Sequence, residues 1–153
     1  MSVNKGKIPF SQGMWVTKSS GEARLLGSRC LSCKELFFPR KVSGICVHCQ
    51  QRRELEDVEL GPFGKIVSFT EVMQPPAGGH YHGPVPYCYG LIDLNDGVRV
   101  EAQLGGDFEK LKVGMKVNLV IEPLYVDSEG NEVQVFRFHP IEEGIIQGGS
   151  HEN

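Results

Sequence analysis

The chain has 153 residues, 40% of them hydrophobic, and a formal net charge of −3 at pH 7. This length fits one domain of ordinary size, or a small domain with an appended module. No apolar run approaches the roughly 18 to 20 residues that cross a bilayer, and residues 1–10 lack the apolar stretch of a secretory signal. We therefore expect a cytoplasmic protein without membrane contact.

The charge is distributed unevenly along the chain. Residues 24–53 carry seven basic residues and one acidic residue, whereas residues 54–153 carry 17 acidic and 6 basic residues. A groove that follows nucleic-acid phosphates needs a positive surface, so the acidic second part argues against a nucleic-acid partner. The basic segment suits contact with nucleic acid, with the phosphates of a coenzyme, or with an acidic protein surface.

The first segment, residues 1–24, is predicted to form an N-terminal arm. It is too short for a core of its own, yet it contains Phe10, Met14, Trp15 and Val16. We expect a short helical turn to gather these side chains. Because exposed apolar clusters commonly mark interfaces, the arm then packs on the rest of the chain or on a partner protein.

Four cysteines dominate the second segment, residues 25–53. They form two C-x2-C pairs separated by twelve residues: Cys30, Cys33, Cys46 and Cys49. Four thiolates close a tetrahedral zinc site and leave no open position for water or substrate, so the pattern predicts a structural zinc ion. The segment is too short to bury a useful apolar core. Metal binding is expected to supply its folding free energy, on the order of 10 to 16 kcal/mol.

Other uses of these cysteines stay open at this point. Two disulfides are the main alternative, although paired cysteines without a secretory signal favour free thiols in a reducing compartment. Iron fits the same four sulfurs chemically. His48 can replace Cys49 as a ligand, but the C-x2-C spacing assigns that position to Cys49.

The third segment, residues 54–141, is predicted to be a small barrel. After Gly61-Pro62 the apolar residues alternate with the period of strands that bury one face. A tight turn is expected at residues 95–97 and a short helix at Asp107–Leu111. The five predicted strands cover about residues 63–73, 87–94, 98–104, 117–122 and 133–138.

This order, three strands, a short helix and two more strands, is typical of the five-stranded OB fold, with an SH3-like barrel as the alternative. The predicted fold is therefore mainly β: an N-terminal arm and a rubredoxin-like zinc ribbon, then an OB-fold barrel. Residues 142–153 are expected to form a flexible tail.

The sequence shows no phosphate loop, GxSxG elbow, HExxH helix or dinucleotide fingerprint. Cys88 with His80 or His82 is the only nucleophile and base that the spacing offers, and a cysteine between two tyrosines of a strand is more typical of a buried hydrophobic residue. We predict no catalytic residue. Residues 74–86 form a long loop rich in Pro, Gly and His, and such loops are often functional.

The residues around the cysteines and in the barrel resemble one known family. Residues 26–33, Phe38-Pro39-Arg40, the second cysteine pair, residues 64–70, Pro86-Tyr87 and residues 114–117 are together similar to the bacterial and archaeal zinc-ribbon OB-fold proteins. Within that family the chain is most similar to the small subunit of thiolases such as benzoylsuccinyl-CoA thiolase. The resemblance covers about residues 10–140.

The resemblance implies a non-catalytic accessory subunit, bound in a hetero-oligomer to a thiolase-fold catalytic subunit that acts on an acyl-CoA, in the setting of aromatic degradation. A steroid acyl-CoA hydratase or aldolase subunit is an alternative partner, and a single-stranded nucleic-acid-binding module is an alternative function. Arg40, Lys41, His80 and His82 are the residues expected to border the acyl-CoA or the partner.

The chain departs from the family at two positions. The family usually has Gly directly after the cysteine pairs, where this chain has Lys34 and Gln50. Because Gly adopts positive φ without strain, we expect these two turns to be strained here.

Overall fold

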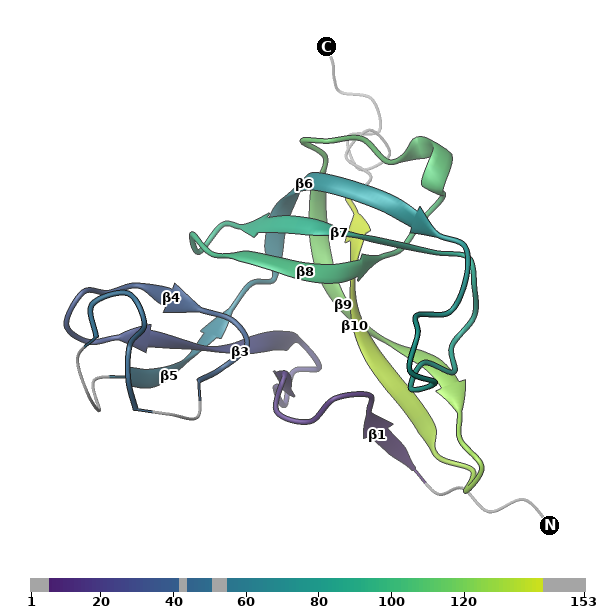
Figure 1. Ribbon diagram of the computed structural model, residues 1–153, viewed down its shortest axis with the longest axis horizontal. Helices are drawn as coiled ribbons and strands as arrows, with labels where there is room; N and C mark the ends of the chain where they lie inside the picture. The colour runs from purple at the N-terminus through teal and green to yellow at the C-terminus, as the bar shows by residue number, and fades with distance from the viewer. Residues whose placement is uncertain (1–5, 42–43, 51–54, 142–153) are drawn as a thin grey trace.

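The computed structural model describes residues 6–41, 44–50 and 55–141, and its regular secondary structure consists of β-strands and one short 3₁₀ turn (Figure 1). No helix in this described part has the length and apolar character needed to cross a membrane. The elements are β1 (Lys7–Pro9), β2 (Trp15–Thr17), β3 (Ala23–Cys30), β4 (Leu36–Phe37), β5 (Leu55–Leu60), β6 (Phe63–Val72), β7 (Tyr87–Leu94), β8 (Arg99–Leu104), the 3₁₀ turn η1 (Phe108–Lys110), β9 (Lys116–Val126) and β10 (Glu132–Pro140).

Five strands close a barrel in the order β6-β7-β8-β10-β9, with β9 pairing back to β6. Strands β8 and β10 run parallel, and the other pairs in the barrel are antiparallel. In the order of the barrel strands along the chain this is 1-2-3-5-4, with η1 between the third and fourth. The prediction of an OB-fold barrel is confirmed.

The alternation predicted for the barrel strands is confirmed in β8, with one exception. Val100, Ala102 and Leu104 are buried, and Arg99 and Glu101 are exposed. The same alternation places Gln103 on the outer face with Arg99 and Glu101, but Gln103 is only 8% exposed. Its Oε1 accepts a hydrogen bond from Arg137 Nε at 3.0 Å, so a polar partner from β10 covers it.

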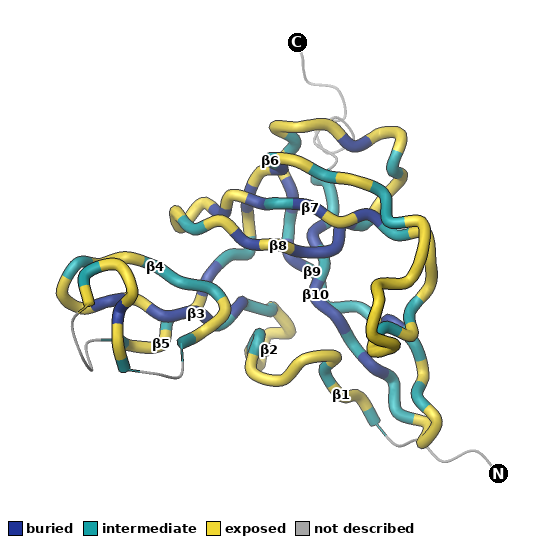
Figure 2. Tube along the Cα trace, viewed as in Figure 1, coloured by how far each residue is buried: buried dark blue, intermediate teal, exposed yellow. Residues whose placement is uncertain are grey.

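The barrel interior holds the main core, drawn dark blue in Figure 2. Its most completely buried side chains come from six different strands, so the core joins elements that are far apart in the chain. Those at 1% exposure or less are Leu25, Leu60, Ile66, Ile92, Val117 and Phe138.

A second, smaller sheet carries the ribbon. β3 pairs antiparallel with β2 and β4 along one edge and with β5 along the other. The arm was expected to form a helical turn, and that prediction is wrong. Its residues instead form the strands β1 and β2, because β10 and β3 offer backbone partners to them. The short β5 was not predicted either.

The arm and the ribbon pack on the barrel. Trp15 and Phe38 contact the Phe136 ring edge-on, with ring centroids 6.1 and 5.8 Å apart. Leu25 and Leu60 are directly paired between β3 and β5 and belong to the barrel core. The predicted division at residues 24, 53 and 141 stays a prediction. Residues 51–54 and 142–153 lie outside the described part.

Phe138 is fully buried at the centre of the barrel, whereas Phe63 is 48% exposed at its edge. We expect Phe138→Ala to lower the free energy of unfolding by about 3 to 5 kcal/mol, since it removes apolar contacts and leaves a cavity. Phe63→Ala is the matched control, with an expected loss below about 1 kcal/mol. Urea unfolding of both variants measures the difference, and equal losses would contradict the assigned core.

Candidate metal centre

The two C-x2-C pairs adopt the same local geometry. In the first pair the Cys33 backbone N–H donates to Cys30 Sγ, with 3.4 Å between N and S, and the Lys34 N–H donates to the Cys30 carbonyl at 2.8 Å. The second pair repeats both bonds. The Cys49 N–H donates to the Sγ of Cys46 at 3.4 Å, and the Gln50 N–H donates to the Cys46 carbonyl at 2.6 Å. Each pair is therefore a tight turn that points its sulfurs to one side.

Lys34 and Gln50 have φ of 68° and 63°, and they are the non-glycine residues with positive φ in the described part of the chain. The sequence departs from the family at these two positions. The turns keep the conformation that glycine favours even though a side chain is present. A left-handed conformation costs a non-glycine residue roughly 1 to 2 kcal/mol. The expected strain is thus present at both turns.

The four sulfurs converge, with all of them within 4.8 Å of one another. Cys30 Sγ lies 3.5 Å from Cys49 Sγ, and Cys33 Sγ lies 3.8 Å from Cys46 Sγ. A disulfide needs about 2.05 Å. Four thiolates about 2.3 Å from a central ion lie about 3.8 Å apart, so these distances fit a tetrahedral metal site and not a pair of disulfides.

The electrostatics of the cluster also favour a cation. The Cys33 backbone N–H lowers the pKa of the Cys30 thiol to about 6. Although the Glu35 backbone N–H favours the Cys33 thiolate, burial and the three neighbouring sulfurs raise the pKa of Cys33 to about 12. Four thiolates this close repel one another, and a divalent cation removes that repulsion.

His48 lies beside the cluster and is exposed to solvent. Its Nδ1 is 3.4 Å from Cys33 Sγ, a hydrogen-bond distance to sulfur, while Cys49 supplies the fourth sulfur. Such contacts orient the ligands of a metal site from outside the coordination shell.

Arg40 and Lys41 stand on the ribbon and are engaged within the chain. Arg40 Nη1 lies 3.0 Å from Asp57 Oδ2 on β5. The Lys41 ammonium lies 5.3 Å from the centre of the Phe37 ring. β5 also supplies acidic partners for Arg29 and Lys18, at 3.4 and 2.7 Å. The basic segment of the sequence is thus partly neutralised by acidic residues that come after it.

His80 and His82 lie in the loop between β6 and β7, on the other side of the molecule from the ribbon (Figure 1). His82 packs its ring against Tyr125, with centroids 5.6 Å apart, and His80 is exposed. Tyr81, between them, fixes the loop: its hydroxyl donates to the Pro84 carbonyl at 2.8 Å, and its ring packs between Phe10 and Tyr87. The structure does not bring the two histidines together with Arg40 and Lys41.

Cys88 is 7% exposed and starts the buried face of β7. Burial raises the pKa of its thiol, and the charges of Glu71 and Asp107 raise it further. A catalytic cysteine needs the opposite, a lowered pKa and access to solvent. The geometry therefore fits a buried hydrophobic residue.

Comparison with known proteins agrees with this architecture. A family model described as "ChsH2, C-terminal OB-fold domain" matches residues 57–122. A DUF35 domain-containing scaffold protein of Pyrococcus furiosus is 32% identical over 120 residues, which cover 77% of this chain and 84% of the relative. The chain belongs to the DUF35 family.

Two further relatives of this DUF35 protein carry more specific names. Benzoylsuccinyl-CoA thiolase subunit BbsA of Thauera aromatica is 32% identical over 117 residues, 76% of each chain. The solved structure of an Ltp2-ChsH2(DUF35) aldolase matches with a TM-score of 0.57 and 30% identity, over 76% of this chain and 84% of that one.

Sequence reasoning missed a polar cluster on the barrel of this DUF35 protein. Glu122 Oε1 lies 2.9 Å from Arg137 Nη1, and its Oε2 lies 2.8 Å from His139 Nε2, although without the geometry of a hydrogen bond. Burial opposes ionisation of Glu122, but these two contacts hold its pKa below the usual value. Glu122 lies on β9, and Arg137 and His139 lie on β10. They are distant in the sequence and come together because these two strands pair.

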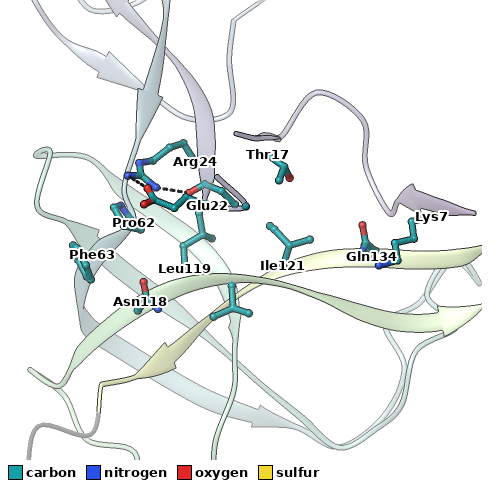
Figure 3. A pocket seen from close by; sticks show the side chains of 13 residues that line it. Lys7, Thr17, Glu22, Arg24, Pro62, Phe63, Asn118, Leu119, Ile121 and Gln134 are labelled. Atoms are coloured by element: carbon teal, nitrogen blue, oxygen red, sulfur yellow. Dashed lines mark hydrogen bonds and ion pairs between the residues drawn. The ribbon is translucent and has the colours of Figure 1, made fainter. Parts of the chain in front are cut away.

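Sequence reasoning also missed a cavity of about 700 Å³ between the arm and the barrel. Figure 3 shows Leu119 and Ile121 of β9 facing Thr17 and Arg24 across it. Arg24 is held there by Glu22, 2.7 Å away. The residues that line the cavity come from segments far apart in the chain, so no local sequence pattern predicts the cavity.

Cys46→Ser tests the metal centre. We expect this variant to lose tight metal binding and the order of the ribbon, because three thiolates no longer close the shell. Elemental analysis and hydrogen exchange measure the two effects. Cys88→Ser is the control and should keep one metal ion per chain. Wild-type protein purified without metal, with its cysteines oxidised to one another, would contradict the site.

Lys34→Gly tests the strained turn in metal-loaded protein. Glycine removes the left-handed strain but gains entropy in the unfolded chain, so we expect a net stabilisation of about 0.5 to 1 kcal/mol. The neighbouring Glu35→Gly, at ordinary φ, should instead lose roughly 0.5 to 1 kcal/mol. Chemical unfolding of the two variants gives the sign of each change, and a loss in both would argue against strain at Lys34.

Proposed function

We propose that this chain is a non-catalytic subunit of an acyl-CoA enzyme complex whose catalytic subunit has a thiolase fold. The observation that carries the proposal is the 32% identity to a benzoylsuccinyl-CoA thiolase subunit over 76% of both chains. Relatives named as scaffold proteins, at 28% to 32% identity, support a role in assembly. A hetero-oligomer in the cytoplasm, and a setting in aromatic degradation, belong to the same proposal.

In this proposal the metal is zinc and its role is structural. Tetrahedral sulfur ligation suits zinc, and four protein ligands leave no position for a substrate. The sulfur separations of 3.5 and 3.8 Å support this geometry. Zinc would hold the two cysteine turns together and so keep the ribbon folded on the barrel.

The reactive groups belong to the partner. Cys88, the cysteine outside the cluster, is buried with a raised pKa, which removes the most plausible nucleophile of this chain. His82 packs on Tyr125 and has no contact with Cys88 among those described.

The predicted border residues take separate places in the proposal. His80 is exposed in the loop between β6 and β7, and this loop, with His80 and His82, would border the acyl-CoA site of the partner. Arg40 and Lys41 would contact the partner from the ribbon. Arg40 would exchange its exposed ion pair with Asp57 at little cost, since such pairs contribute little to stability.

An aldolase partner is the second candidate, because a solved aldolase containing a DUF35 chain matches with a TM-score of 0.57. A nucleic-acid-binding module has less support. Residues 54–153 carry 17 acidic residues, and the ribbon's Arg29 and Arg40 are paired with acids of β5. A single-stranded oligonucleotide that shifted in a salt-sensitive way would favour that reading.

The decisive experiment mixes the purified chain with the thiolase-like protein encoded beside it. Light scattering should give a hetero-oligomer, and thiolytic cleavage of acyl-CoA should require or change with the complex. The isolated chain should show no turnover. Turnover that disappears on Cys88→Ala or His82→Ala would mean an independent enzyme. Retro-aldol cleavage without thiolysis would select the aldolase candidate, and absence of any complex would overturn the proposal.

A further inference from the structure

Four polar side chains form a layer on the outside of the barrel, next to the loop between β6 and β7. We define the polar layer as Gln103 of β8, Glu122 of β9, and Arg137 and His139 of β10. Gln103 is buried, and the Arg137 side chain is 17% exposed. Glu122, Arg137 and His139 line a cavity of about 490 Å³ together with Pro84 of the loop. The layer is therefore largely covered, and the loop adjoins it.

Arg137 occupies the centre of the polar layer. Its Nε donates to Gln103 Oε1 at 3.0 Å, and its Nη1 donates to Glu122 Oε1 at 2.9 Å. His139 lies at the other oxygen of Glu122, and its ring packs so closely on Gly105 that a Cβ there would overlap the ring. A planar guanidinium can orient two partners at once in this way, whereas the single nitrogen of a lysine cannot keep both bonds in the same geometry.

The loop of residues 74–86 packs tightly against the barrel. Figure 1 shows it beside β9 and β10. At Gly83 an added Cβ would lie 2.6 Å from Tyr81 Oη and 2.8 Å from Leu124 Cδ1 of β9, and both distances are too short for a side chain. Glycine is thus required at this position by the closeness of the loop to β9. The loop is packed on the barrel and does not stand off from it.

A directed series of hydrogen-bonding groups connects the polar layer to the loop. Because Arg137 occupies the carbonyl oxygen of Gln103, the amide nitrogen of Gln103 remains for Tyr81. Burial raises the pKa of Tyr81, and a hydrogen bond with Gln103 and the charge of Arg137 lower it, as donation toward the phenol oxygen would. The Tyr81 hydroxyl in turn donates to the Pro84 carbonyl at 2.8 Å. Each group therefore orients the next one.

Stability alone is a weak reason for such a layer. The cost of desolvation largely offsets the attraction within a buried ion pair, and apolar residues of similar volume often stabilise a protein as well. What satisfied polar partners add is a single defined geometry. The side chain that this geometry fixes is Tyr81, whose neighbours in the sequence are His80 and His82.

We propose that Arg137 is a positioning residue: through Gln103 it fixes Tyr81, and so it sets where the loop presents His80 to the acyl-CoA site of the partner. This inference rests on the proposed function, which puts the loop at that site. Arg137 itself touches no substrate in this proposal. It acts through the loop that covers it.

The first test measures the order of the loop in the full-length, metal-loaded chain by ¹⁵N relaxation. We expect backbone order parameters of about 0.85 for residues 77–83 in the wild type, and below about 0.6 in Arg137→Lys. Arg99→Lys is the matched control. Arg99 also makes two hydrogen bonds, to Asp93 at 2.7 and 3.1 Å, but it lies at the other end of β8 from Gln103, so the loop should keep its order.

Tyr81→Phe tests the path from the layer to the loop. This change keeps the ring that packs between Phe10 and Tyr87 and removes the hydroxyl. It should loosen the loop as Arg137→Lys does, and the double variant should loosen it no further, because both changes interrupt one series of hydrogen bonds. Thermal unfolding of each variant establishes that the barrel is folded before relaxation is measured.

The second test uses the complex with the thiolase-like protein encoded beside this chain. Arg137→Lys should raise the KM for the acyl-CoA about tenfold and leave kcat nearly unchanged, because a displaced loop weakens substrate binding and not the chemical step. In a His80→Ala background the same change should have little further effect. A merely structural role of Arg137 would show no such dependence on His80.

The outcomes separate the two proposals. An ordered loop in Arg137→Lys, a disordered loop in the wild type, or equal loosening by Arg99→Lys overturns the positioning role and leaves the proposed function standing. A loosened loop with an unchanged KM overturns the link between the loop and the acyl-CoA site. No complex with the wild-type chain overturns the proposed function and that link with it, while the relaxation data still decide whether Arg137 fixes the loop.

Discussion

The convergence of four cysteine sulfurs is the constraint on which the ribbon depends. The residues next to the cysteines bury little apolar surface, since Leu31, Ile45 and Val47 around the cluster are exposed. The hydrophobic effect alone therefore cannot hold the two turns together. A cation bound by the thiolates would supply the missing cohesion, and it would offset the cost of the backbone conformation that the side chains of Lys34 and Gln50 disfavour.

The barrel solves a different problem, since a sheet must close or cover its edges. Closure is achieved by the parallel contact of β8 with β10, which lets β9 return to β6. Strand β1 extends the sheet beyond the barrel by pairing with β10 at Lys7–Pro9. The arm is thereby a part of the sheet and not an appendage.

Much of this architecture follows from local patterns in the sequence. The alternation of Val100, Ala102 and Leu104 with Arg99 and Glu101 was enough to predict β8, and cysteine spacing was enough to predict the cluster. β5 was missed because Leu55–Leu60 is rich in acidic residues, and only pairing with β3 makes it a strand. β1 and β2 were missed because they too are strands only through their pairing with β10 and β3. Their conformation is set by partners distant in the sequence.

The functional residues also fall into those that a local sequence motif predicts and those that only the fold brings together. The four cysteines share a local motif, so their site could be predicted, whereas Glu122, Arg137 and His139 are brought together only by the pairing of β9 with β10. Arg40 and the histidines of the loop carried no spacing that tied them to one another, and the structure places them apart. The acidic partners of the ribbon arginines come from β5, which sequence reasoning had assigned to the barrel.

The paired strands β3 and β5 connect the metal-binding end of the ribbon to the barrel. Leu25 and Leu60 are anchored in the barrel core at one end of this pair, and Cys30 belongs to the metal cluster at the other. Two hydrogen-bonded strands resist bending far more than a single linker does. The angle between the ribbon and the barrel is therefore expected to vary little. A partner that binds the ribbon and the barrel together would meet a preorganised surface, and little conformational entropy would be lost on association.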